Sequence, residues 1–122
     1  SRMSALIFSL LAISIATASA APTACEGCQC CEQSLITVTT AGSGAHPFDS
    51  DVTDNSGECA VRTFTCKGGH ANIEVNDHAG VVAAPPGGTE VKFEVTCNAA
   101  GTAWVWENII DITKLECASD PF

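Results

Sequence analysis

The stretch Glu90-Val-Lys-Phe-Glu-Val-Thr-Cys97 decides the fold, because its apolar and polar residues alternate without interruption. A period of two predicts a β-strand with one buried face and one solvated face. Val91, Phe93, Val95 and Cys97 would share the buried face, and we therefore expect Cys97 to lie in the core.

Similar short runs of β-branched and aromatic residues continue on both sides of this strand. Turn formers separate them, as in Pro85-Pro-Gly-Gly88, and no helical period is sustained. The sequence predicts an all-β fold, a small disulfide-stabilised β-sandwich of about seven short strands, with a partly open barrel as the alternative. We expect loops at Ala21–Gln33 and Ala41–Glu58. The other expected strands are Leu35–Thr40, Ala60–Cys66, Ala71–Asn76, Gly80–Ala83, Thr102–Trp106 and Ile109–Cys117.

Residues 1–20 have the features of a secretory signal peptide. Arg2 supplies positive charge, Ala5 to Ala16 form a short apolar run, and Ala18-Ser-Ala20 is a small-residue cleavage pattern. The run falls short of the roughly 20 residues that span a bilayer, so we expect cleavage after Ala20 and no membrane association afterwards. The remainder would be one module, with a cysteine-rich segment at residues 21–33 and a sandwich at residues 34–122; residues 28–33 belong to the sandwich module. The signal peptide predicts secretion to the extracellular space.

The chain is strongly acidic, with a formal net charge of −9 over 122 residues. Without the leader and its arginine, four basic residues would face fourteen acidic ones, which gives −10. Such a charge repels nucleic acids and other polyanions, so no nucleic-acid partner is expected. It permits cationic surfaces or calcium, or it serves only to keep the protein soluble.

All eight cysteines follow the predicted leader, and their even number allows complete pairing. In an oxidising compartment this predicts a disulfide framework. Cys66 follows Phe64 in phase as Cys97 follows Phe93, which favours a Cys66–Cys97 core bridge. Cys59 would lie about 23 Å from Cys66 along one strand, too far to join it, which leaves Cys59 and Cys117 for the amino-terminal cluster or for each other. The alternative is that the cluster of four thiols binds zinc or copper. The eight are Cys25, Cys28, Cys30, Cys31, Cys59, Cys66, Cys97 and Cys117.

Several cysteine-containing segments together resemble the nematode six-cysteine domain. They include Cys59-Ala-Val-Arg-Thr-Phe-Thr-Cys66, Val95-Thr-Cys-Asn98 and Leu115-Glu-Cys-Ala-Ser119. The resemblance implies a secreted extracellular module with three bridges and no established activity. Cys25 and Cys30 lie outside the pattern and either form a fourth bridge or cross-link chains, which leaves the oligomeric state open. The six cysteines of the pattern would be Cys28, Cys31, Cys59, Cys66, Cys97 and Cys117.

Two segments are candidate ligand sites. Trp104 and Trp106 would share one strand face, as in a platform that stacks sugar rings; the alternative is that they pack in the core. Asp49–Glu58 is rich in the oxygen ligands that calcium requires, although its spacing is not that of an EF-hand. The alternative for this segment is a solvated acidic loop.

No catalytic constellation is recognisable. His46, His70 and His78 lie in expected loops without motif spacing, and Ser43 lacks the context of a nucleophile elbow. We therefore expect no enzyme, no cofactor and no bound metal. The leading hypothesis is a noncatalytic extracellular interaction or matrix module for an unknown protein or glycan. The alternative is a small-ligand binder, for glycan through Trp104 and Trp106 or for calcium through Asp49–Glu58.

Overall fold

The computed structural model describes residues 25–120, and the predicted signal peptide lies outside this range. Two short 3-10 turns, η2 (Gly27–Gln29) and η3 (Gln33–Leu35), precede the strands. No helix between residues 25 and 120 is long and apolar enough to cross a membrane. The strands are β1 (Thr37–Thr39), β2 (Ala45–His46), β3 (Ser50–Asp54), β4 (Val61–Lys67), β5 (Gly69–Val75), β6 (Gly80–Ala83), β7 (Glu90–Cys97), β8 (Trp104–Trp106), β9 (Ile110–Ile112) and β10 (Lys114–Asp120).

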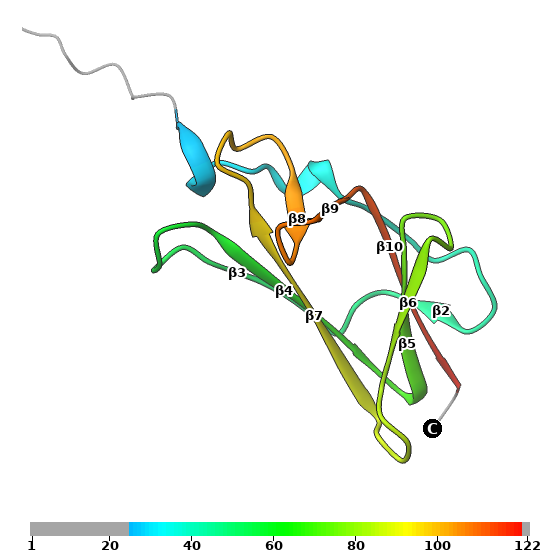
Figure 1. Cartoon of the computed structure of the whole chain (residues 1–122). Coiled ribbons are helices and arrows are strands. Elements are labelled where there is room, and N and C mark those ends of the chain that lie inside the picture. Colours follow the sequence, from blue (N-terminus) through cyan, green and yellow to red (C-terminus); the bar gives the residue numbers. More distant parts are fainter. Residues whose placement is uncertain (1–24, 121–122) are drawn as a thin grey trace, which may run out of the picture.

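The strands form two sheets that pack as layers (Figure 1). Sheet A has the order β1-β10-β5-β6, with β2 also paired to β10. Sheet B has the order β3-β4-β7-β8-β9. The pairing of β1 with β10 is parallel, and the other pairings between described strands are antiparallel. The predicted all-β sandwich is confirmed, and the sheets do not close into a barrel.

The strand β7 has the bounds that its alternation predicts, and its apolar face is buried as expected. Cys97 is 2% exposed, so its predicted core position is confirmed. The core lies between the sheets, where residues from each sheet cover the apolar face of the other. Its largest fully buried side chains include Phe64, Ile73, Trp104, Ile112 and Leu115.

The predicted single strand Ile109–Cys117 is wrong, because the chain changes sheets at Thr113. β9 belongs to sheet B and β10 to sheet A. The Asn76 side chain fixes the crossing: its Oδ1 accepts from the amides of Thr113 at 2.8 Å and Lys114 at 3.3 Å. Ile112 and Leu115 are both buried at a spacing of three, which a single strand with only one buried face does not allow.

The predicted loop Ala41–Glu58 is also partly wrong, since it contains β2 and β3. The polar sequence of β3 resembles a loop, but the strand pairs with β4 along all five of its residues. It ends sheet B, and a strand at a sheet edge tolerates polar and charged residues on both faces.

Four disulfides pair all eight cysteines: Cys25–Cys30, Cys28–Cys59, Cys31–Cys97 and Cys66–Cys117. The predicted Cys66–Cys97 bridge is wrong. β4 and β7 are antiparallel, so Cys66 lies opposite Val91, six residues from Cys97 and about 20 Å from it along the strand. Cys66 instead reaches across the core to Cys117 of sheet A.

Candidate functional site

The outer face of sheet A, turned away from the core, is hollowed into a groove of about 480 Å³, here called the polar groove. Strands β1, β5 and β10 supply its floor, and the turns after β1 and β5 supply its walls. The side chains that give the groove its chemistry are Thr39, Glu74, Asp77, His78, Lys114 and Glu116.

Two carboxylates oppose each other in this groove. Glu74 of β5 and Glu116 of β10 are direct partners in the antiparallel pairing, so they project from the same face of sheet A. Like charges in directly opposite positions destabilise a sheet, and a positive group placed between them would relieve this repulsion.

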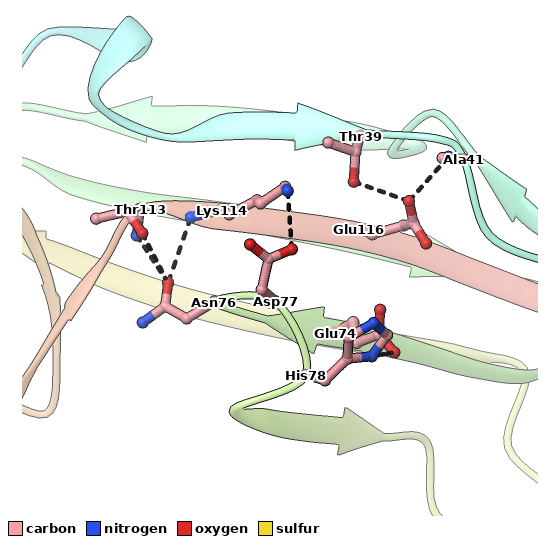
Figure 2. A network of polar contacts seen from close by, with 9 residues as sticks. All are labelled: Thr39, Ala41, Glu74, Asn76, Asp77, His78, Thr113, Lys114 and Glu116. Atoms are coloured by element: carbon pink, nitrogen blue, oxygen red, sulfur yellow. Dashed lines mark hydrogen bonds and ion pairs between the residues drawn. The ribbon is translucent and has the colours of Figure 1, made fainter.

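Glu116 is held in place from β1, as Figure 2 shows. Its Oε1 accepts hydrogen bonds from the Thr39 hydroxyl at 2.8 Å and from the Ala41 amide at 2.9 Å. The Thr39 bond is the largest cause that lowers the pKa of Glu116; partial burial opposes it, and the amides of Ala41 and Gly42 and the charge of His78 add to it. The groove therefore keeps a fixed negative charge at neutral and mildly acidic pH.

The other ionisable groups in the groove pair locally (Figure 2). His78 Nδ1 lies 2.6 Å from Glu74 Oε2, and Lys114 Nζ donates to Asp77 Oδ1 at 2.8 Å. Asp77 and His78 are exposed and lie in a left-handed turn that starts at Asn76, with φ between 51° and 71°. Because the Asn76 side chain anchors this turn to the start of β10, both groups stay beside the groove.

The polar groove does not contain a cluster of closely spaced metal ligands. Within residues 25–120, one group of three potential metal ligands has its ligand atoms within 4.8 Å of one another. The group consists of His46, Cys66 and Cys117. The two sulfurs form a disulfide there, so they are not thiolate ligands, and His46 Nε2 is held by Ser119 Oγ at 2.9 Å. The alternative of a zinc or copper site in the amino-terminal cysteine cluster is likewise wrong, since those cysteines are paired.

The tryptophan platform considered as a glycan site is not formed. Trp104 is 0% exposed, and its Nε1 donates to the Glu32 carbonyl at 2.9 Å, so core packing is confirmed for this residue. Trp106 is half-buried and stacks on Phe93 with ring centroids 6.3 Å apart. Trp104 belongs to the core cluster and Trp106 packs against it, so the face shared by the two rings is turned toward sheet A.

The carboxylates of Asp49–Glu58 do not converge on one point. Asp51 forms a bidentate pair with Arg62, at 2.8 and 2.7 Å. Asp54 accepts from the hydroxyl and amide of Ser56, which lower the pKa of Asp54, and Asp49 accepts from the Lys67 amide at 2.7 Å. The three aspartates each have a different partner, and no three ligand groups of residues 49–58 lie within 4.8 Å of one another, so this segment offers no shared calcium site.

The histidines also lie apart. His46 belongs to β2 and His70 to β5 rather than to the expected loops, whereas His78 lies in a turn. His70 Nδ1 pairs with Asp120 at 2.7 Å, His46 Nε2 pairs with the adjacent Ser119 at 2.9 Å, and His78 pairs with Glu74, so each ring has a different partner. The sequence did not indicate Glu74 and Glu116 as site residues, because only the register between β5 and β10 makes them neighbours.

The sandwich and its disulfides define a small disulfide-rich β-domain, of the kind that fits an extracellular protein. The family model of the C6 domain matches residues 31–117, and the chain belongs to this family. The resemblance to the nematode six-cysteine domain is thereby confirmed.

One curated relative matches most of this chain but only part of its own length. Uncharacterized protein R07B1.7 of Caenorhabditis elegans is 33% identical over 97 residues, which cover 75% of this chain and 65% of that protein. The match thus takes in less than two thirds of the length of the curated relative. No solved structure matches the chain.

Proposed function

We propose that this chain is a secreted, noncatalytic binding module whose polar groove takes up arginine and lysine side chains of extracellular proteins. The observation that carries the proposal is the direct opposition of Glu74 and Glu116 across β5 and β10. His78 Nδ1 already lies 2.6 Å from Glu74 Oε2, and a cation brought by a partner would add a second counter-charge to the pair of carboxylates.

The dimensions of the groove favour an organic cation over a metal ion. Its acids are not gathered within 4.8 Å of one another as a small ion requires, whereas its volume of about 480 Å³ accommodates extended side chains. A guanidinium group is flat, has several donors and pairs well with carboxylates. The net charge of −9 adds long-range attraction for basic partners.

The scaffold supports a binding role in an oxidising compartment. Four disulfides cross-link a chain of this size, and none of the cysteines at residues 25–120 is free. Such frameworks persist outside the cell and fix the strands that present the groove. Export is tested by recovering the protein from the medium of secreting cells, where its amino terminus should be Ala21. Retention of the full chain inside the cell would contradict this part of the proposal.

Binding is tested by calorimetry with a short arginine-rich peptide and a glutamate-rich peptide of equal length. We expect the arginine peptide alone to bind, with an affinity that falls at high salt. Combining Glu74→Gln and Glu116→Gln should weaken binding about tenfold or more.

The matched control combines Glu90→Gln and Glu94→Gln on β7. It makes the same change in net charge on the exposed face of sheet B. The control should bind the arginine peptide within about twofold of the wild type at high salt, where long-range attraction is screened. Equal losses in both double variants would show that net charge alone acts and would rule out the groove.

A further inference from the structure

Strand β6 ends sheet A and leaves one side of its backbone open. The Ala84 amide donates to the Ala71 carbonyl at 2.9 Å, which sets the alternation of hydrogen bonds between β5 and β6. Val82 therefore directs its backbone groups at β5, whereas Val81 and Ala83 direct their amides and carbonyls away from the sheet. These outward groups can pair with an added strand.

The composition of β6 does nothing to prevent such pairing. Its residues, Gly80-Val-Val-Ala83, include no charged residue and no proline. The strands that end sheet B differ, since β3 carries Asp51 and Asp54 and β9 carries Asp111. Charged side chains and prolines are the usual means by which proteins block the edges of their sheets.

An apolar groove of about 150 Å³ lies beside β6, between the two sheets. Its floor includes the buried side chains of Phe93 and Ile112, and its walls include Trp106, Ile110 and Val82. A cavity of roughly 150 Å³ holds a group the size of benzene. The apolar groove thus has room for one aliphatic or aromatic side chain.

Exposed apolar residues flank this groove. Among residues 25–120, the two most exposed large apolar residues are Ile109 and Val81, at 75% and 61%; Val81 lines the groove and Ile109 precedes Ile110, which also lines it. Exposed apolar groups beside a groove are a feature of contact surfaces.

The charge of the chain selects the occupant of this edge. Glu74 lies directly opposite Val81 in the pairing of β5 with β6, so a carboxylate stands on the outer face of sheet A next to β6. A basic partner is attracted by the net charge of −9, whereas a second copy of the chain brings the same net charge and is repelled.

We propose that β6 and the apolar groove dock an extended, basic segment of a partner protein by strand addition. The backbone of the segment pairs with Val81 and Ala83, and one of its apolar side chains enters the groove. Its alternate lysines or arginines project to the outer face of sheet A, the face that carries Glu74. The proposal deepens the proposed function and rests on it, since it takes the basic partner from there and names a second point of attachment.

The probe is a short peptide that alternates lysine and valine, observed by NMR on the oxidised protein. Strand addition should protect the amides of Val81 and Ala83 from hydrogen exchange and shift the indole resonance of Trp106. Two further peptides carry backbone N-methyl groups, one on every lysine and the other on every valine. Because successive residues of a strand direct their amides to opposite sides, one methylated peptide should bind about tenfold more weakly and the other should bind normally. Equal affinities of the two methylated peptides would overturn the proposal.

A variant tests the protein side of the contact. Val81→Pro removes an amide that faces away from β5, so the sheet should stay intact while the affinity for the lysine–valine peptide falls about tenfold. Val81→Thr keeps that amide and should bind like the wild type. If Val81→Pro does not fold, the difference in affinity between the two methylated peptides still tests strand addition.

The outcomes separate this inference from the proposed function. If the peptide binds and only the Glu74→Gln and Glu116→Gln combination weakens it, strand addition is wrong and the polar groove stands. If neither this peptide nor the arginine peptide binds, both proposals are wrong. If the free protein dimerises with Val81 and Ala83 already protected, the occupant of β6 is a second copy and the proposal is overturned.

Discussion

Sheet B and sheet A differ in how charges are arranged on their outer faces. On the outer face of sheet B, Lys67 and Lys92 both lie 3.9 Å from carboxylate oxygens of Glu90, so charges of opposite sign alternate. On the outer face of sheet A, Glu74 and Glu116 carry like charges in opposite positions.

The disulfides are also distributed differently between the two sheets. Cys28–Cys59 and Cys31–Cys97 attach the amino-terminal segment to the start of β4 and the end of β7, both in sheet B. Cys66–Cys117 is the disulfide that joins the two sheets. Sheet B is thus fixed covalently to the amino-terminal segment, whereas sheet A carries the directly opposed carboxylates and the edge strand β6, which has no charged residue.

The largest expected effect comes from breaking the link between the sheets. Combining Cys66→Ala and Cys117→Ala opens a loop with a separation of 51 residues and should lower the free energy of unfolding by about 4 kcal/mol. Combining Cys25→Ala and Cys30→Ala opens a separation of 5 residues and should cost about 2 kcal/mol or less. Urea denaturation of both variants measures the difference. Equal losses would mean that sheet A does not depend on this link.

The next effect concerns the buried charge of sheet B. Arg62 is 3% exposed, pairs with Asp51, and lies 4.5 Å from the centre of the Phe64 ring. Asp51→Asn leaves the guanidinium without its counter-charge and should cost about 2 kcal/mol, less than for a fully buried pair because Asp51 is partly exposed. Adding Arg62→Met should restore part of the loss in thermal unfolding. A loss no smaller in the double variant would contradict a charge-based explanation.

A smaller effect of opposite sign is expected in sheet A. In a His78→Ala background, which removes the partner that contacts Glu74 at 2.6 Å, Glu74→Gln removes half of the like-charge pair and should raise stability by a few tenths of a kcal/mol. Glu94→Gln is the matched control, because Glu94 lies opposite the uncharged Thr63 in sheet B. Denaturation at low salt compares them. If Glu74→Gln is clearly destabilising, the two carboxylates do not repel as proposed.

The smallest effect is a pH dependence at Glu116. Folding lowers its pKa below the ordinary value of 4.5, so the ionised form adds stability that is fully present above that value and is lost as the pH falls through the folded pKa. Wild type should therefore exceed Glu116→Gln in stability at neutral pH, and the difference should shrink below pH 4.5. Titrating the unfolding midpoint of both proteins measures it. A difference that grows toward acid would contradict the hydrogen bonds from Thr39 and Ala41.

Strand positions could be predicted wherever a clear period of two stood between turn residues. The bounds of β6 and β7 agree with the prediction for this reason. The prediction failed where one run of apolar residues served two sheets: the odd spacing of Ile112 and Leu115 signals the break at Thr113, but the continuous composition hides it. β3 was missed because acidic residues on an edge strand look the same in sequence as a solvated loop.

The sequence alone determined the all-β class, the burial of Cys97 and the membership of six of the eight cysteines in a family pattern, because alternation and residue spacing are local properties of the chain. The tertiary structure decided which cysteines meet, that Trp104 is internal, and that Glu74 faces Glu116. Each of these depends on which strands become neighbours and in which register, and a shift of one residue would place every side chain of a strand on the other face.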